Sequence, residues 1–262
     1  DQWKGVNLAD GQDGLYNKDK AKAQLEKAKA ELQKDGVQFP IHIDVPVAQN
    51  STNFVSRMQS LKQTVEDTLG KDNVVIDVQK LSTDDADNAT YFAQSPDQKD
   101  FDMDITGWGP DFQDPSTYLN ILNPTDGSTL TGMGLDPKKD QALIEKIGLN
   151  QYKELLDAAN AEKLDTNARY EKYAAAQAWL TENAMVLPIY SKGGVPSITK
   201  VTPFSAANSA IGIKGETTFF KYQKLQDKTV TTAEHEKAYK NWLKEKEESN
   251  KKAQEELAKH VK

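Results

Sequence analysis

Few residues in this sequence have the types and the spacing that catalysis requires. The three histidines, His42, His235 and His260, lie far apart, and no two of them have the spacing of metal ligands. Ser197 and Lys200 form a Ser-x-x-Lys pair of the kind that serine acylases use, but the Ser-Asp-Asn and Lys-Thr-Gly elements that accompany it are missing from the sequence. We therefore expect no enzyme activity, no metal and no cofactor, and a hydrolase that uses Asp/Glu pairs or Ser197 and Lys200 is the weakest alternative.

Composition excludes further classes of function. The 262 residues carry 33 Lys and Arg against 40 Asp and Glu, a net charge of −7, whereas nucleic-acid binding needs a basic surface. The absence of cysteine excludes disulfides and thiolate metal sites. Apolar runs are all shorter than the roughly 18 residues that cross a bilayer. The length allows one or two domains.

One loop, residues 106–115, is suited to recognition. Gly107 and Gly109 would let another backbone approach closely, and Trp108 between them offers a flat apolar face with a single N–H donor. Asp111 adds a fixed negative charge. These groups can receive an extended guest that has a backbone and a positively charged end. The alternative is a rigid turn, anchored by the tryptophan, that only packs.

The elements before this loop alternate between helix and strand. Such an order implies crossover connections and a mostly parallel sheet covered by helices. The loop then follows the third strand directly, at the carboxyl end of the sheet where ligands gather in open α/β folds. The apolar periodicity predicts helices at about 18–35, 51–69 and 84–93, and strands at 41–45 (closed by Pro46), 74–78 and 101–105.

The elements after the loop are mostly helical. A helical turn is predicted at 116–122, and a fourth strand at 185–190 is interrupted by Pro188. Thr231 and Glu234 form a capping box that begins a long Lys/Glu-rich helix. This helix is interpreted as a solvated face, with a partner-binding surface as the alternative. Further helices are predicted at 138–147, 150–160 and 166–184, and a β segment at 219–222 within the strand-and-loop region 191–230.

The loop and its surroundings resemble the solute-binding proteins of oligopeptide ABC importers. The pattern Gly-Trp-x-x-Asp-aromatic-x-Asp-Pro, followed by a short aromatic and leucine helix, recurs in that family and here covers Gly107 to Leu119. The preceding helix–strand pairs and the later segment from Tyr170 to Tyr190 extend the similarity over nearly residues 15–230. The tail, from Lys224 through the Glu/Lys helix, resembles streptococcal peptide-binding lipoproteins of the Ami/Ali type.

The resemblance implies a fold and a domain organisation. The fold would be α/β, periplasmic-binding-protein-like of type II: a second lobe with a mixed sheet flanked by helices, then a C-terminal return segment and a long charged helix. Residues 1–190 would form the second lobe, residues 191–230 would return toward a first lobe, and residues 231–262 would form the helix. We expect a C-terminal fragment of a longer lipoprotein, which holds one wall of the cleft and binds peptide weakly or not at all.

The resemblance also implies a ligand and partners. The loop glycines would pair with the backbone of an oligopeptide, and Asp111 would meet its α-ammonium group. Ile105 stands where some relatives carry an arginine near the carboxyl end of the ligand. The partner would be an ABC permease at the extracellular face of the cell membrane, with membrane contact only through the lipid anchor of the full-length protein. A surface interaction module that uses the C-terminal helix is the alternative function. The predicted ligand-binding residues are Thr106, Gly107, Trp108, Gly109, Asp111, Phe112 and Tyr118.

Overall fold

The computed structural model describes residues 17–112, 114–189, 198–205 and 223–261. The chain divides into two compact units, which we call unit 1 (Asp1–Thr106 with Ser128–Ile144) and unit 2 (Gly107–Gly127 with Glu145–Lys262). Each unit is described by itself. The division into a lobe, a return segment and a terminal helix, with boundaries after residues 190 and 230, stays a prediction.

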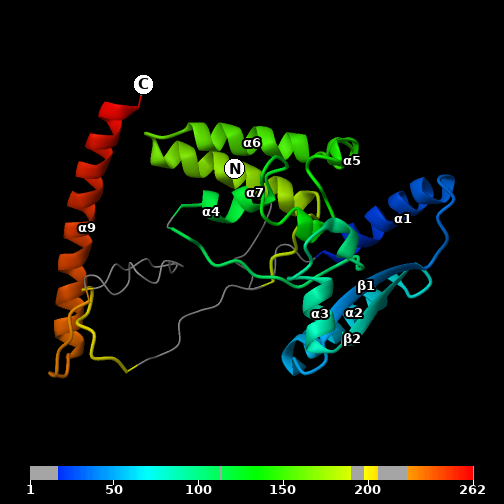
Figure 1. The fold of residues 1–262 in the computed structure, drawn as a ribbon, viewed down its shortest axis with the longest axis horizontal. Coiled ribbons are helices and arrows are strands. Elements are labelled where there is room, and N and C mark those ends of the chain that lie inside the picture. Colours follow the sequence, from blue (N-terminus) through cyan, green and yellow to red (C-terminus); the bar gives the residue numbers. More distant parts are fainter. Residues whose placement is uncertain (1–16, 113, 190–197, 206–222, 262) are drawn as a thin grey trace. The chain divides into compact units, whose positions relative to one another are not determined.

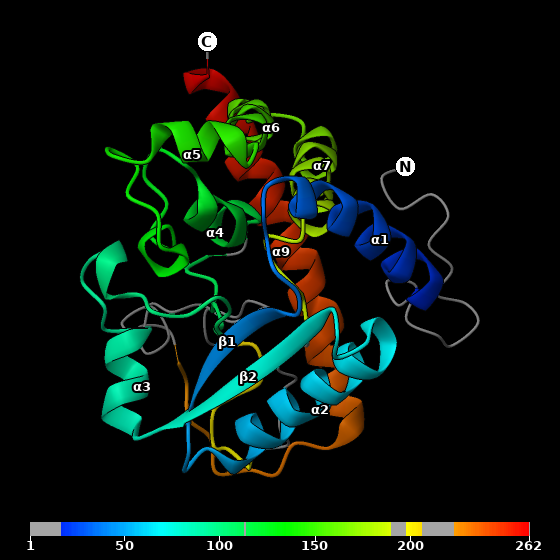
Figure 2. The same cartoon turned by 90° about the vertical axis from the view of Figure 1, so that its right-hand side faces the viewer.

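Unit 1 is built around two parallel strands. β1 (Ile41–Ala48) and β2 (Val74–Leu81) pair along their full length, from Ile41 opposite Val74 to Ala48 opposite Leu81. The crossover between them is the helix α2 (Thr52–Leu69), which begins after Ser51 and ends at Gly70 with φ of 85°. Figure 2 shows the two strands side by side with α2 packed along them. The parallel pairing predicted for these two strands is confirmed.

The two faces of this small sheet differ in chemistry. Side chains of a strand alternate between its faces, so one face carries Val45 and Ile76, which form the core with Met58 of α2. The other face carries polar groups: the His42 Nδ1 and Asp77 Oδ2 atoms lie 2.6 Å apart, and Gln79 donates to Asp44 at 3.0 Å. The partly buried residues that pack against the core include Ile43, Val55, Leu61, Val65, Val78, Met103 and Ile105.

The helices of unit 1 match the predicted positions, with shifted ends. The N-cap of α1 (Lys18–Lys34) is Asn17, whose side chain accepts from the Lys20 N–H. Ser82 caps α3 (Thr83–Ala89) in the same way, through the Asp85 N–H, and α3 ends earlier than predicted. The remaining elements are the 3-10 helices η1 (Pro96–Gln98) and η3 (Thr131–Met133), and α5 (Gln141–Lys146), which crosses into unit 2.

Unit 2 is helical in its described residues. The helices α6 (Leu149–Ala161) and α7 (Thr166–Glu182) lie side by side in Figure 1. Tyr152 of α6 and Tyr173 of α7 are among the largest buried side chains, at 0% and 2% exposed. A short helix follows the predicted binding loop: α4 (Ser116–Leu119), continued by the 3-10 helix η2 (Asn120–Leu122).

The C-terminal helix α9 (Thr232–His260) begins as predicted. Thr231 and Glu234 form both hydrogen bonds of a capping box. None of the residues of α9 is buried, which agrees with a solvated helix. Near its start, the rings of Tyr239 and Trp242 lie 5.5 and 5.4 Å from the ring of Phe204.

The strand predicted at 101–105 is wrong. The Asp44 carbonyl of β1 accepts from the backbone N–H groups of both Asp102 and Met103, each at 3.1 Å. The Asp44 N–H, however, donates to the carboxylate of Asp102 at 2.9 Å instead of to a carbonyl. A side chain thus interrupts the ladder, and the segment runs beside β1 without forming a strand. The loop therefore does not follow a strand end, although Met103 and Ile105 do pack on the core as their spacing predicts.

Two further strand predictions need correction. Residues 185–189 form no strand, and Leu187 and Ile189 are 63% and 57% exposed, so burial does not favour one there. Pro46 does not close β1, which continues to Ala48 with Pro46 opposite Gln79. In the parts of residues 191–230 that the structure describes, the β structure is an isolated antiparallel bridge between Val201 and Leu225. The segment 219–222 lies outside the described residues.

Candidate functional site

The predicted binding loop, residues 106–115, is here called the Trp-loop. Thr106 ends the first segment of unit 1, and the loop residues from Gly107 onward belong to unit 2. Trp108 and Phe112 are 38% and 52% exposed, and Gly107 and Asp111 are exposed as well. A Cβ atom built on Gly107 would meet no atom within 4 Å, so the backbone there can be approached. The loop therefore presents the groups that the sequence assigned to recognition.

Asp111 is tied to the helix that follows the loop. Its backbone N–H donates to the Thr117 hydroxyl oxygen at 2.9 Å, and that hydroxyl donates to Asp111 Oδ2 at 3.3 Å. Thr117 is buried on α4, whereas Asp111 is exposed. The arrangement fixes the position of the Asp111 carboxylate relative to α4 while leaving the residue at the surface. Gln113 lies outside the described residues.

A second set of bonds holds the end of the loop. The Arg169 guanidinium of α7 donates from Nε and Nη2 to the two carboxylate oxygens of Asp114, both at 2.9 Å. The Nη2 atom also donates to the Tyr173 hydroxyl at 2.9 Å, and Nη1 donates to the carbonyl oxygens of Ala159 and Glu162 at 3.0 and 2.8 Å. Such a bidentate pair fixes geometry as well as charge. The loop is thereby joined to the turn between α6 and α7.

The electrostatics of this pair favour its ionised form. Burial alone would raise the pKa of Asp114, but hydrogen bonds from Arg169 and Ser116 outweigh it and lower that pKa below its ordinary value. The same hydrogen bond with Asp114 raises the pKa of Arg169. The side chains are 24% and 19% exposed, so solvent screens the pair only in part. Both shifts therefore favour the charged forms that make the ion pair.

Within unit 2, the structure brings some of the predicted site residues together. Asp111 and Tyr118 are joined through α4, on which Tyr118 is half-buried and its N–H donates to the Pro115 carbonyl at 3.0 Å. Thr106 belongs to the other unit. The sequence analysis missed Thr117, and it also missed Arg169, whose only signal was that it is one of two arginines in the chain.

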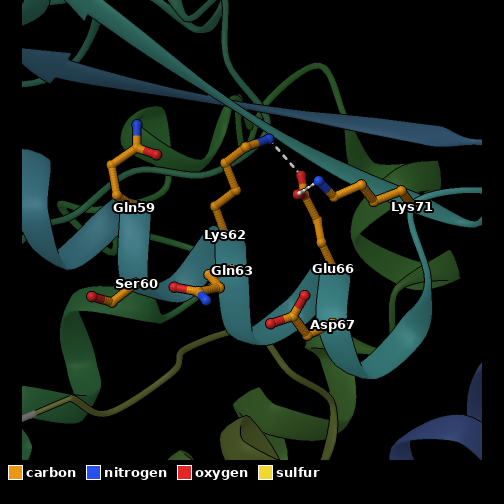
Figure 3. Close-up of a pocket in the computed structure, with 7 residues that line it drawn as sticks. All are labelled: Gln59, Ser60, Lys62, Gln63, Glu66, Asp67 and Lys71. Atoms are coloured by element: carbon orange, nitrogen blue, oxygen red, sulfur yellow. Dashed lines mark hydrogen bonds and ion pairs between the residues drawn. The ribbon is translucent and has the colours of Figure 1, made fainter.

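A hydrophilic hollow of about 430 Å³ lies elsewhere, on α2 of unit 1. In Figure 3, Lys62 and Lys71 both point toward the carboxylate of Glu66, at 2.5 and 3.7 Å. Glu66 is 5% exposed and also accepts from the Ile76 N–H of β2 at 3.2 Å. The hydrogen bond from Lys62 lowers the pKa of Glu66 against the effect of burial. This cluster fastens α2 to β2 and contains no predicted site residue.

Other chemistry finds little support in the described ranges. Within them, no group of three or more His, Asp or Glu side chains is placed to hold a metal ion. Across the same ranges, no helix combines the length and the apolar character needed to cross a membrane. Of the Ser-x-x-Lys pair, Ser197 lies outside the described residues, and Lys200 is ion-paired with Asp227 at 2.8 Å.

The comparisons with known proteins first define a class. Residues 1–129 match the family model described as bacterial extracellular solute-binding proteins, family 5, middle region. Together with helices that flank a small parallel sheet, this match confirms the predicted α/β fold class of a solute-binding protein. The matched family is one of solute-binding proteins and not of enzymes.

The particular relatives are streptococcal. Over its whole length, the chain is 54% identical to the oligopeptide-binding protein AliA of Streptococcus pneumoniae serotype 4 and 54% identical to the oligopeptide-binding protein SarA of Streptococcus gordonii. It spans 40% of the length of each. These matches confirm the resemblance that the Trp-loop and the tail predicted. Among solved structures, the unliganded open form of the murein tripeptide-binding protein MppA superposes with a TM-score of 0.44 at 21% identity, over 62% of this chain and 27% of that one.

Proposed function

We propose that this chain takes part in the capture of oligopeptides for an ABC importer at the extracellular face of the cell membrane, where a lipid anchor holds the whole protein. The Trp-loop is the part that receives the amino-terminal end of the peptide. The proposal is supported by the identity to streptococcal oligopeptide-binding proteins over the whole chain. The observation that carries it is the exposure of Gly107 and Asp111 on a loop whose base is fixed from two sides.

The two groups have different tasks. An extended peptide that lies along the loop can exchange backbone hydrogen bonds with Gly107 and Gly109, as in strand addition, and these bonds do not depend on the peptide's sequence. An ion pair in open solvent contributes only about 0–1 kcal/mol. Asp111 therefore sets the register by selecting the charged end of the peptide, and most of the affinity comes from backbone bonds and from the exclusion of water.

NMR titration tests this proposal, because it detects binding even at a dissociation constant of about 1 mM, which corresponds to about 4 kcal/mol. Tetra-alanine is added to the isotopically labelled chain, and the amide resonances of Gly107 and Gly109 are followed. We expect these resonances and the indole N–H resonance of Trp108 to move together as peptide is added, even where binding is too weak to reach saturation. Amides of β1 and β2 serve as the internal control and should stay in place. Loop resonances that stay in place at peptide concentrations well above about 1 mM would refute the proposal.

A further inference from the structure

The link between Arg169 and Asp114 joins two segments that are 55 residues apart in sequence. Asp114 lies at the end of the Trp-loop, directly before Pro115 and the start of α4. Arg169 lies on the first turn of α7, whose N-cap Asp165 accepts from the Asn167 and Ala168 N–H groups. The position of the loop end therefore depends on a residue of the distant helical hairpin.

Arg169 is itself held rigidly. All three of its nitrogens donate hydrogen bonds, and two of these bonds go to the backbone carbonyls of Ala159 and Glu162 at the end of α6. Its guanidinium carbon lies 4.9 Å from the centre of the Tyr173 ring, and the Tyr173 hydroxyl is bonded in turn to Asn160. A guanidinium with this many fixed contacts can hold the Asp114 carboxylate in one orientation.

The orientation passes from Asp114 to the binding groups through short bonds. Asp114 Oδ1 accepts from the Ser116 N–H at 3.0 Å, its N–H donates to the Phe112 carbonyl at 3.0 Å, and its carbonyl accepts from the Thr117 N–H at 3.2 Å. Thr117 then holds both the N–H and the carboxylate of Asp111. Each step from Arg169 to Asp111 is thus a hydrogen bond or a single residue of chain.

We propose that Arg169 is a positioning residue for peptide recognition: it holds Asp114, and through Asp114 and Thr117 it fixes the Trp-loop in the shape that binds the amino-terminal end of a peptide. This inference rests on the proposed function. Without the clamp, the loop would occupy its binding shape for only part of the time, and the apparent affinity would fall by that fraction. A loop that holds this shape about a tenth of the time would bind about tenfold more weakly.

The test uses three variants of the chain and two readouts. Arg169→Lys keeps the charge but cannot donate two parallel bonds, and Asp114→Asn removes the charge pair while the bonds of Arg169 to the α6 carbonyls remain. Lys153→Gln is the matched control, because it removes an ion pair of the same hairpin, with Asp157 on α6, whose two residues bond neither Arg169 nor Asp114. The first readout is the set of Gly107, Trp108 and Gly109 resonances without peptide, and the second is the affinity for tetra-alanine.

We expect both Arg169→Lys and Asp114→Asn to shift or broaden the loop resonances and to weaken tetra-alanine binding about tenfold. The control should change neither readout. The positive charge that Arg169→Lys retains should not be enough to keep the loop in its binding shape. If Arg169→Lys unfolds the hairpin, Asp114→Asn decides. Loop resonances or a peptide affinity that remain as in the wild type in Asp114→Asn would overturn the inference. Loop resonances that respond in a chain that binds no peptide would uphold the positioning role and refute the proposed function instead.

Discussion

The hydroxyl of Tyr152, on α6, donates a hydrogen bond of 2.8 Å to the carbonyl oxygen of Leu119, at the end of α4. Both residues are buried, and burial raises the pKa of Tyr152 far above its ordinary value. The bond satisfies a carbonyl at the C-terminal end of a short helix that has few partners of its own. It also ties the segment after the Trp-loop to the core of unit 2.

Removal of this hydroxyl should destabilise unit 2. In Tyr152→Phe the Leu119 carbonyl stays buried without its donor, and we expect a loss of about 1 to 3 kcal/mol in the free energy of unfolding. Urea denaturation followed by circular dichroism measures this change. Tyr91→Phe is the control, because Tyr91 is 82% exposed and its change should be negligible. Equal stability of the two variants would contradict the assigned role of Tyr152.

In unit 1, the buried carboxylate of Glu66 should matter more than its exposed neighbour. Glu66→Gln removes the ion pairs with Lys62 and Lys71 beneath the sheet. We expect it to lower the free energy of unfolding by about 1 to 3 kcal/mol. Asp67→Asn is the control: it replaces a carboxylate by an amide one residue further along α2, at a position that is exposed instead of buried. A larger loss in Asp67→Asn than in Glu66→Gln, measured in the same urea titration, would show that the cluster does not fasten α2 to β2.

Acid should weaken both units for the same reason. The folded-state pKa values of Asp114 and Glu66 lie below their ordinary values of 3.8 and 4.5. A carboxyl whose pKa is depressed by folding stabilises the protein fully above its unfolded-state pKa, and this stabilisation is lost as the pH falls through the folded-state value. We therefore expect stability to decline below about pH 4.5. Asp114→Asn and Glu66→Gln should each make this decline shallower, and an unchanged slope in both variants would contradict the pKa directions.

The glycines differ in what they tolerate. A Cβ atom on Gly127 would lie 2.5 Å from the Ile121 carbonyl oxygen and 2.6 Å from that of Asn123, and backbone atoms cannot move aside cheaply. Gly127→Ala should therefore cost about 1 to 3 kcal/mol of stability. Gly107→Ala meets no atom and should leave stability unchanged, yet its methyl group would obstruct a peptide backbone at the loop. Thermal unfolding and the tetra-alanine titration, applied to both variants, separate these two effects.

Local patterns in the sequence were sufficient to predict the helices and the first two strands. Apolar spacing gave the positions of α1 and α2, and the β-branched run from Val74 to Val78 gave β2, because these patterns lie within each element's own sequence. The capping box at Thr231 was readable for a similar reason, since both its bonds span only three residues.

Long-range contacts could not be read in this way. The segment 101–105 alternates like a strand, but the carboxylate of Asp102 competes for the Asp44 N–H, which lies 58 residues away. The site shows the same limit. Gly107, Trp108 and Asp111 carry a local motif, whereas Arg169 gives no sign of its role until the fold places it on Asp114.

The most direct test of the central claim compares two peptides on two proteins. Tetra-alanine with a free amino terminus and its N-acetylated form are titrated against the chain and against Asp111→Asn, with the Gly107 and Gly109 amide resonances as the readout. If Asp111 receives the α-ammonium group, the wild-type chain should prefer the free peptide by about fivefold, the factor expected for about 1 kcal/mol, and the variant should bind both peptides equally. Equal affinity of the wild-type chain for the two peptides would contradict the account. A preference for the free peptide that survives in Asp111→Asn would contradict it as well.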